Sequence, residues 1–170
     1  HDSGCRVVSI HPMFGPDSQL LSNKHVIFIN MGDDAALQSA KQLFRPTMVE
    51  RIEMKFEDHD RLISYILGLS HLLNITFMTV LAESGEAAEQ LANLSSTTFD
   101  AQWHIAANVT HENPDLYYEI QKLNQYSPTI INALDDTINR LKDILHHNHQ
   151  PAFVQLMHQA KDYLTIRKTP

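Results

Sequence analysis

The stretch "HVIFINMGDDAALQSAKQLFRPTMVERIEMKF", residues 25–56, decides the fold of the first part of the chain. Its apolar run at 25–30 predicts a strand, and Asp33 is expected to cap a helix that runs through Phe44. Proline then ends that helix, and alternating apolar residues at 49–56 predict a second strand. A strand, a helix and a strand in this order predict a parallel crossover unit.

The preceding segment, "SIHPMFGPD" at residues 9–17, places one histidine after a further short apolar run. We expect His11 to lie at the carboxyl end of a strand, where parallel sheets bind ligands. Pro12 favours an extended backbone at His11, and Gly15 permits a tight turn. A fixed imidazole can accept a proton from a substrate hydroxyl, although a rigid turn with a purely structural histidine would give the same pattern.

From residue 57 onward the pattern is helical. A helix expected at about 58–82 is apolar on most of its circumference and therefore needs cover on several sides; its main stripe is Leu62, Ile66, Leu69, Leu73 and Phe77. Further helices are expected at 86–94 and 98–111 and at three X-Pro pairs. Asn113 and Ser127 are expected to cap the helices that begin at Asn113-Pro114 and Ser127-Pro128, and Gln150-Pro151 begins the last helix. The fold class is thus mainly α with a small α/β N-terminal part, and the uncovered helix suggests a homodimer.

Composition excludes several classes of function. The formal charge of −7 and the pI near 5.8 argue against nucleic-acid binding, which needs clustered Lys and Arg. Cys5 is the only cysteine, which excludes an intrachain disulfide and fits a cytoplasmic location. The apolar run at 62–81 contains His71 and Asn74, so we expect a buried helix rather than a membrane span.

The eleven histidines raise the question of a metal site. His146 and His149 share a helix face, and His104 and His111 lie two turns apart. No paired Glu or Asp ligand motif accompanies them, and histidines near a helix end suit the helix dipole. We therefore predict no metal site.

Three segments together resemble one family. "HPMFGPD" (11–17) is similar to the active-site loop of the prephenate and arogenate dehydrogenases, enzymes of tyrosine biosynthesis. "FEDHDRLISYILGLSHLL" (56–73) resembles the family's acidic-His-Asp segment and its later Ser/Arg-His pair, and "ENPDLYYEIQKLN" (112–124) resembles the start of a late helix. The resemblance implies the end of a Rossmann nucleotide-binding domain at 1–56 and a helical dimerisation and substrate-binding domain at 57–170.

The resemblance implies an oxidative decarboxylation of prephenate to 4-hydroxyphenylpyruvate that depends on NAD or NADP. It assigns the catalytic role to His11, which would accept the proton of the substrate hydroxyl. The glycines at 4, 15, 32, 68 and 85 cannot form a GxGxxG fingerprint. We therefore expect an upstream domain outside this chain to bind most of the cofactor, and the chain alone to be inactive.

The resemblance also implies roles for residues near His11. Phe14 and Asp17 would line the same loop, with Asp17 toward the cofactor. His71 would contact the substrate or a tyrosine effector, and the alternative is a histidine hydrogen-bonded within the helix bundle. The acidic residues of Asp58-His59-Asp60 are expected to favour the helix dipole.

One position departs from the family pattern. Where the family has an arginine that pairs with a substrate carboxylate, this chain has Asn108, which offers no charge and no bidentate fork. His104 or His111 could supply part of the missing charge. The alternatives therefore include an arogenate-specific dehydrogenase and a non-catalytic dimerisation or tyrosine-sensing module.

Overall fold

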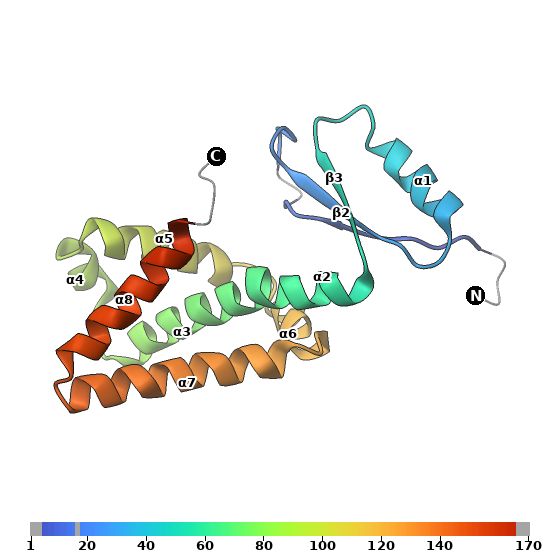
Figure 1. Cartoon of the computed structure of the whole chain (residues 1–170). Coiled ribbons are helices and arrows are strands. Elements are labelled where there is room, and N and C mark those ends of the chain that lie inside the picture. Colours follow the sequence, from blue (N-terminus) through green and yellow to red (C-terminus); the bar gives the residue numbers. More distant parts are fainter. Residues whose placement is uncertain (1–4, 16–17, 166–170) are drawn as a thin grey trace. The chain divides into compact units, whose positions relative to one another are not determined.

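The computed structural model describes residues 5–15 and 18–165 of the chain. It contains a small three-stranded sheet followed by helices, as the sequence predicts (Figure 1). Two compact units divide at residues 67 and 68, inside a long helical segment. The boundary expected from the sequence, at residue 56, falls where this segment begins.

The first unit is built on a sheet of order β1-β2-β3, with β1 at Ser9–Pro12, β2 at His25–Ile29 and β3 at Glu50–Met54. Helix α1, Asp34–Leu43, connects β2 to β3, and these two strands are parallel. The predicted crossover unit is therefore confirmed.

Strand β2 is buried because both of its faces are covered. Val26 and Phe28 pack toward α1, which lies along the sheet in Figure 1, and form a cluster with Leu37, Ala40 and Val49. Ile27 and Ile29 pack on the opposite side with Ile63 of helix α2, Phe56–Ile63. Burial on alternating sides explains why this strand is a continuous apolar run.

Strand β1 corrects one prediction. It pairs with β2 in the antiparallel direction, and His11 lies inside the strand, opposite Ile27. His11 therefore does not follow the carboxyl end of a parallel strand. The connection at residues 13–24 is long enough for either strand direction, so the sequence left the direction undetermined. The pairing places His11 beside Ile27, whose side chain packs toward α2.

A carboxylate caps the N-terminus of α1. Asp33 accepts a hydrogen bond from the backbone N–H of Ala36 at 2.8 Å, which confirms the predicted N-cap. Arg6 donates to both Asp33 oxygens, at 3.1 and 3.0 Å. The Arg6 guanidinium and the Ala36 N–H lower the pKa of Asp33 to about 2.

One helical segment runs from Phe56 to Glu83. It consists of α2, a π-helical stretch η1 at Ser64–Leu69, and α3 at Ser70–Glu83. The second unit continues with α4 Ala88–Asn93, α5 Thr97–Thr110, α6 Pro114–Leu123, α7 Ser127–His146 and α8 Gln150–Thr165. Within this unit α3 packs along α5.

The apolar stripe of the long helix is largely exposed within the chain. Exposed fractions are 39% for Leu62, 53% for Ile66 and 46% for Leu73. The buried positions of this helix include Ser64, His71 and Asn74. The single chain therefore does not supply all of the cover that the sequence predicts this helix to need.

Residues 56–83 are long and apolar enough to cross a bilayer by length and composition, and 17% of their most apolar stretch is buried in the chain. A helix that a second protein surface covers passes the same test. Length and composition alone therefore do not distinguish a membrane span from an interface helix.

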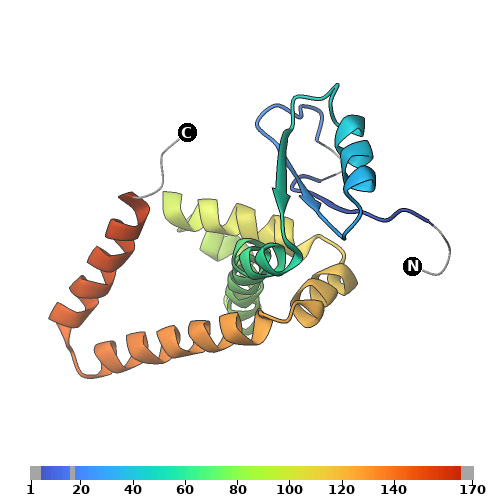
Figure 2. The same cartoon turned by 45° about the vertical axis from the view of Figure 1, so that its right-hand side comes forward.

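The X-Pro pairs differ in their capping. Asn113 caps α6 as predicted, because its side chain accepts from the N–H of Asp115 at 2.9 Å. Ser127 was expected to cap α7, but Tyr126 takes the cap position and Ser127 is the first, buried residue of the helix. Helix α8 begins at Gln150 as predicted and turns back from α7 at an open angle (Figure 2).

Candidate functional site

Backbone pairing fixes the chain both before and after His11. Its strand pairs with β2 from Ser9 to Pro12, and the N–H of Met13 donates to the carbonyl of His25 at 2.9 Å. Pro12 restricts the backbone that follows His11. The imidazole is therefore presented from a fixed edge strand.

A second histidine contacts His11 from helix α2. The Nδ1 atom of His11 lies 2.9 Å from Nε2 of His59, and the two rings meet edge to face with centroids 5.2 Å apart. His59 lies in the first turns of α2, where its backbone N–H donates to the carbonyl of Lys55 at 2.9 Å. Two secondary-structure elements of the first unit thus bring these imidazoles together.

A carboxylate completes this chain of contacts. Nδ1 of His59 lies 2.9 Å from Oδ1 of Asp60, and the side chains of His59 and Asp60 are only 12% and 20% exposed. Because an ionised carboxylate only accepts, His59 must carry a proton on Nδ1. In neutral His59, Nε2 is then an acceptor, so His11 donates from Nδ1. This assignment leaves Nε2 of His11 unprotonated, with a lone pair able to accept a substrate proton.

The electrostatics of the first unit favour the neutral form of His11. Burial lowers the pKa of His11 below its ordinary value, and the nearby His59 lowers it further. Desolvation disfavours the charged imidazolium. The neutral form of His11, with Nε2 unprotonated, is therefore favoured at neutral pH and is suited to act as a general base.

Phe14 and Asp17 were the two other residues expected to line the loop of His11. Phe14 packs against the cluster of Val26 and Phe28 on the α1 side of the sheet, which gives it a role in the core. Asp17 lies outside the described residues.

His71 belongs to the second unit, where it stacks on Tyr117. The ring centroids are 4.2 Å apart with an interplanar angle of 27°, and His71 is 8% exposed. Its Nδ1 atom is buried without a hydrogen-bond partner, and burial lowers the pKa of His71. Burial also raises the pKa of Tyr117, and Glu112 adds to this shift.

Polar side chains continue along the same interior face of this unit. Asn74 donates to the carbonyl of Ser70 at 2.7 Å and accepts from Gln102 at 2.8 Å. Gln121 donates to the carbonyl of Gly68 at 3.0 Å. A pocket of about 400 Å³ adjoins this layer and is lined by Ile75, Val109, Thr110, Glu112, Pro114, Tyr117, Tyr118 and Gln121.

Asn108 and His104 are exposed and lie one helical turn apart on α5. Neither lines the pocket beside Tyr117. His111, near the end of the same helix, places Nδ1 2.6 Å from the carbonyl of Ala107. Asn108 and His104 therefore share one exposed helix face, as a polar contact to a ligand would require.

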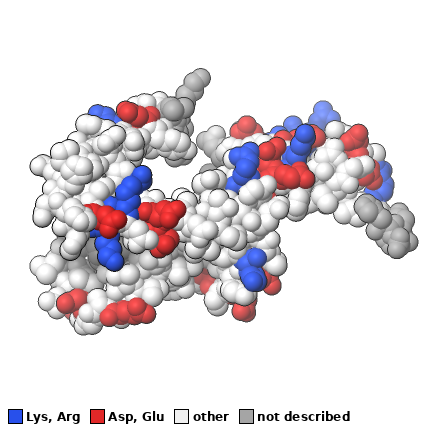
Figure 3. Space-filling view, turned by 60° about the horizontal axis from the view of Figure 1, so that its bottom comes forward, with Lys and Arg blue, Asp and Glu red and all other residues white. Residues whose placement is uncertain are grey.

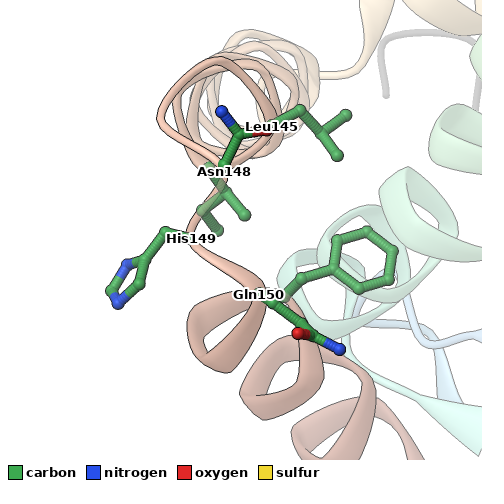
Figure 4. A pocket seen from close by; sticks show the side chains of 6 residues that line it. Leu145, Asn148, His149 and Gln150 are labelled. Atoms are coloured by element: carbon green, nitrogen blue, oxygen red, sulfur yellow. The ribbon is translucent and has the colours of Figure 1, made fainter.

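The histidines near the end of α7 surround a turn. Asn148 has a φ of 52° there, and Figure 4 shows it with His149 and Gln150 beside a pocket of about 290 Å³ that Ile144, Leu145 and Phe153 also line. The His149 ring points away from the labelled side chains. Within residues 5–15 and 18–165, no three His, Cys, Asp or Glu residues gather as metal ligands.

Solved structures identify the class of fold. The prephenate dehydrogenase of Aquifex aeolicus, solved with hydroxyphenyl propionate and NAD+, matches 96% of this chain with a TM-score of 0.75 at 19% identity. The arogenate dehydrogenase of Synechocystis matches 93% with a TM-score of 0.70 at 17% identity. The chain covers 60% of each of those structures. It has the fold of these dehydrogenases.

The family model "Prephenate dehydrogenase, dimerization domain" matches residues 55–159, so the chain belongs to the prephenate dehydrogenase family. A probable arogenate/prephenate dehydrogenase of Methanocaldococcus jannaschii is 24% identical over 160 residues. A 4-amino-4-deoxyprephenate dehydrogenase of Streptomyces pristinaespiralis is 22% identical over 161 residues. These matches include 92% and 95% of this chain, which spans 36% and 54% of the two relatives.

His59 was not predicted to be a functional residue from the sequence. Helix capping accounted for the acidic residues of Asp58-His59-Asp60 and so assigned no task to the histidine between them. The available signal was the position of His59 in the segment that resembles the family's acidic-His-Asp motif. Its contact with His11 depends on strand direction and sheet face, which the sequence did not determine.

We predict that histidine NMR titration of the chain gives a pKa for His11 below that of an exposed histidine. His59→Gln should raise this pKa, because it removes a neighbouring imidazole that can become charged. The pKa should nevertheless stay below the ordinary value, since burial is the larger cause. An ordinary or raised pKa in the unmodified chain would contradict the environment described for His11.

Proposed function

We propose that this chain forms part of a prephenate dehydrogenase, which converts prephenate to 4-hydroxyphenylpyruvate by NAD(P)-dependent oxidative decarboxylation in tyrosine biosynthesis. The main support is the geometry of His11, whose Nδ1 contacts His59 while Nε2 is assigned as a proton acceptor. Nε2 of His11 makes no hydrogen bond within the described part of the chain. The substrate hydroxyl would donate to this atom.

His11 would act on the proton of the substrate. As the hydroxyl carbon becomes a carbonyl carbon, the oxygen loses its proton to Nε2 of His11. When carbon dioxide leaves and the ring becomes aromatic, the same oxygen becomes a phenolate and takes a proton back. A base whose pKa is lowered by burial can perform both transfers, because its protonated form readily returns the proton to the phenolate.

The nicotinamide cofactor would accept the hydride, but the N-terminus of α1 does not provide a site for its diphosphate. A helix N-terminus after a parallel strand is the usual anion site. At α1 this position holds the Asp33 carboxylate, which already accepts from Ala36 and Arg6. The cofactor would therefore be held mainly by residues outside these 170.

In the enzyme assembled with its cofactor-binding part, His11→Asn should lower kcat by about 10²–10⁴-fold, the usual contribution of a general base. KM should change little, because asparagine retains a hydrogen-bonding side chain. His25→Asn is the matched control, since His25 lies on the adjacent strand and is 45% exposed. Unchanged turnover in His11→Asn would instead favour a non-catalytic dimerisation or tyrosine-sensing module.

Asn108 and His104 would contact a carboxylate of prephenate or arogenate. Their exposure and their spacing of one turn on α5 are compatible with this role. The amide would supply a neutral hydrogen bond where the family pattern has a charged fork. His71 would contribute to substrate binding from the interior of the same unit, where its Nδ1 atom lacks a partner.

Asn108→Arg should lower KM for the substrate by about 10- to 100-fold, equivalent to about 1.5–3 kcal/mol for a charged hydrogen bond. Asn108→Lys is the control for charge without a bidentate fork, and its effect should be smaller. Steady-state kinetics with prephenate and with arogenate would also show for which substrate KM decreases. No change of KM with either substrate would mean that the substrate carboxylate does not bind at Asn108.

We propose that the helical domain forms a homodimer. Its family model is a dimerization domain, and apolar residues face outward from several helices. Ile131, Ile138 and Leu145 recur every seven residues on one side of α7 and are 45%, 49% and 63% exposed.

The surface charge does not favour nucleic acid as a partner. Figure 3 shows Lys and Arg interspersed with Asp and Glu on one face, which gives that face no basic patch for nucleic acid.

Sedimentation or light scattering should give twice the chain mass of 19.4 kDa. Ile138→Glu should shift the protein toward the monomer, because it buries a charge in the proposed interface. Arg140→Glu changes charge on the opposite side of α7 and should leave the dimer intact. A monomeric unmodified chain at micromolar concentration would exclude this dimer.

A further inference from the structure

Helix capping does not explain the side chain of His59. Lys55 is the N-cap residue of α2, and no side chain caps this helix end. Asp58 pairs with Arg61 at 2.9 Å, on an exposed surface. His59 and Asp60 instead form a largely buried pair directed at His11. Two carboxylates that are two residues apart therefore have different tasks.

We propose that His59, supported by Asp60, is a positioning residue that takes up the Nδ1 proton of His11 while the substrate proton occupies Nε2. This inference rests on the proposed dehydrogenase function and adds a partner to its base. His59 need not contact the substrate, because it acts through the ring of His11.

The proton transfers balance. The substrate O–H bond breaks as an N–H bond forms at Nε2 of His11. The Nδ1–H bond of His11 breaks as an N–H bond forms at Nε2 of His59. The hydride, with its electron pair, leaves the substrate carbon for an oxidised nicotinamide. When the phenolate forms, both protons return along the same path.

The resting geometry prepares this transfer. The 2.9 Å separation of Nδ1 and Nε2 is a hydrogen-bond distance, so the proton moves without a change of rotamer. Positive charge on His11 is disfavoured by its burial. Positive charge on His59 would lie 2.9 Å from the Asp60 carboxylate. The charge therefore moves to the ring that has an anionic partner.

Replacing His59 by glutamine distinguishes the positioning of His11 from the uptake of its Nδ1 proton. In His59→Gln the amide oxygen can still accept the Nδ1 proton of His11, but the amide cannot be protonated at neutral pH. In the enzyme assembled with its cofactor-binding part, kcat should fall about 10- to 100-fold because proton uptake is lost, a loss of the size seen when the hydrogen-bond partner of a metal-bound histidine is changed. KM should change little. Asp58→Asn is the control and should keep the kcat of the unmodified enzyme.

A second measurement on the unmodified 170-residue chain needs no substrate. Nitrogen-15 NMR of the histidine rings should show His11 protonated on Nδ1 and unprotonated on Nε2 at neutral pH. The same tautomer in His59→Gln would show that the variant keeps His11 positioned. Asp60→Asn should weaken this preference, because the amide can donate to His59 as well as accept from it.

Two results would overturn the inference. One is full kcat in His59→Gln, which would mean that a hydrogen-bond acceptor suffices at this position. The other is protonation of His11 on Nε2 in the unmodified chain. If His11→Asn is inactive while His59→Gln is fully active, this inference fails alone; if both variants are fully active, the proposed function fails as well.

Discussion

The antiparallel pairing of β1 with β2 is the constraint on which the candidate site depends. It sets His11 opposite Ile27, on the side of the sheet that packs against α2. A shift of register by one residue would turn the His11 side chain to the α1 side, where Phe28 and Leu37 fill the core. The contact between His11 and His59 therefore follows from strand pairing, and the Asp60 carboxylate then determines which nitrogen of His11 carries the proton.

Much of this fold could be predicted from local sequence. The apolar run of β2, the cap at Asp33 and the proline after α1 define a crossover unit through short-range physical rules. The direction of β1 could not be predicted in this way, because the loop before β2 allows both directions. His11 was found from its loop and from family resemblance, whereas His59 required knowledge of which helix covers which face of the sheet.

The long helix shows a second limit of pattern analysis. Hydrophobic periodicity predicted that the stripe containing Leu62, Ile66 and Leu73 needs cover, and these residues are exposed in the single chain. Polar positions such as His71 and Asn74 are buried instead and are bordered by Tyr117 and Gln102. A periodic stripe shows that a surface must be covered, but not whether the same chain covers it. The proposed dimer would explain the exposed stripe.

The central claim is that His11 accepts the proton of the substrate hydroxyl at Nε2. A crystal structure of the assembled enzyme with oxidised nicotinamide and 4-hydroxyphenylpyruvate would test it most directly. We expect the phenolic oxygen of the product at a hydrogen-bond distance of about 2.6–3.2 Å from Nε2 of His11, with Nδ1 still on His59. A phenolic oxygen held by other residues, with His11 turned away from the product, would contradict the account.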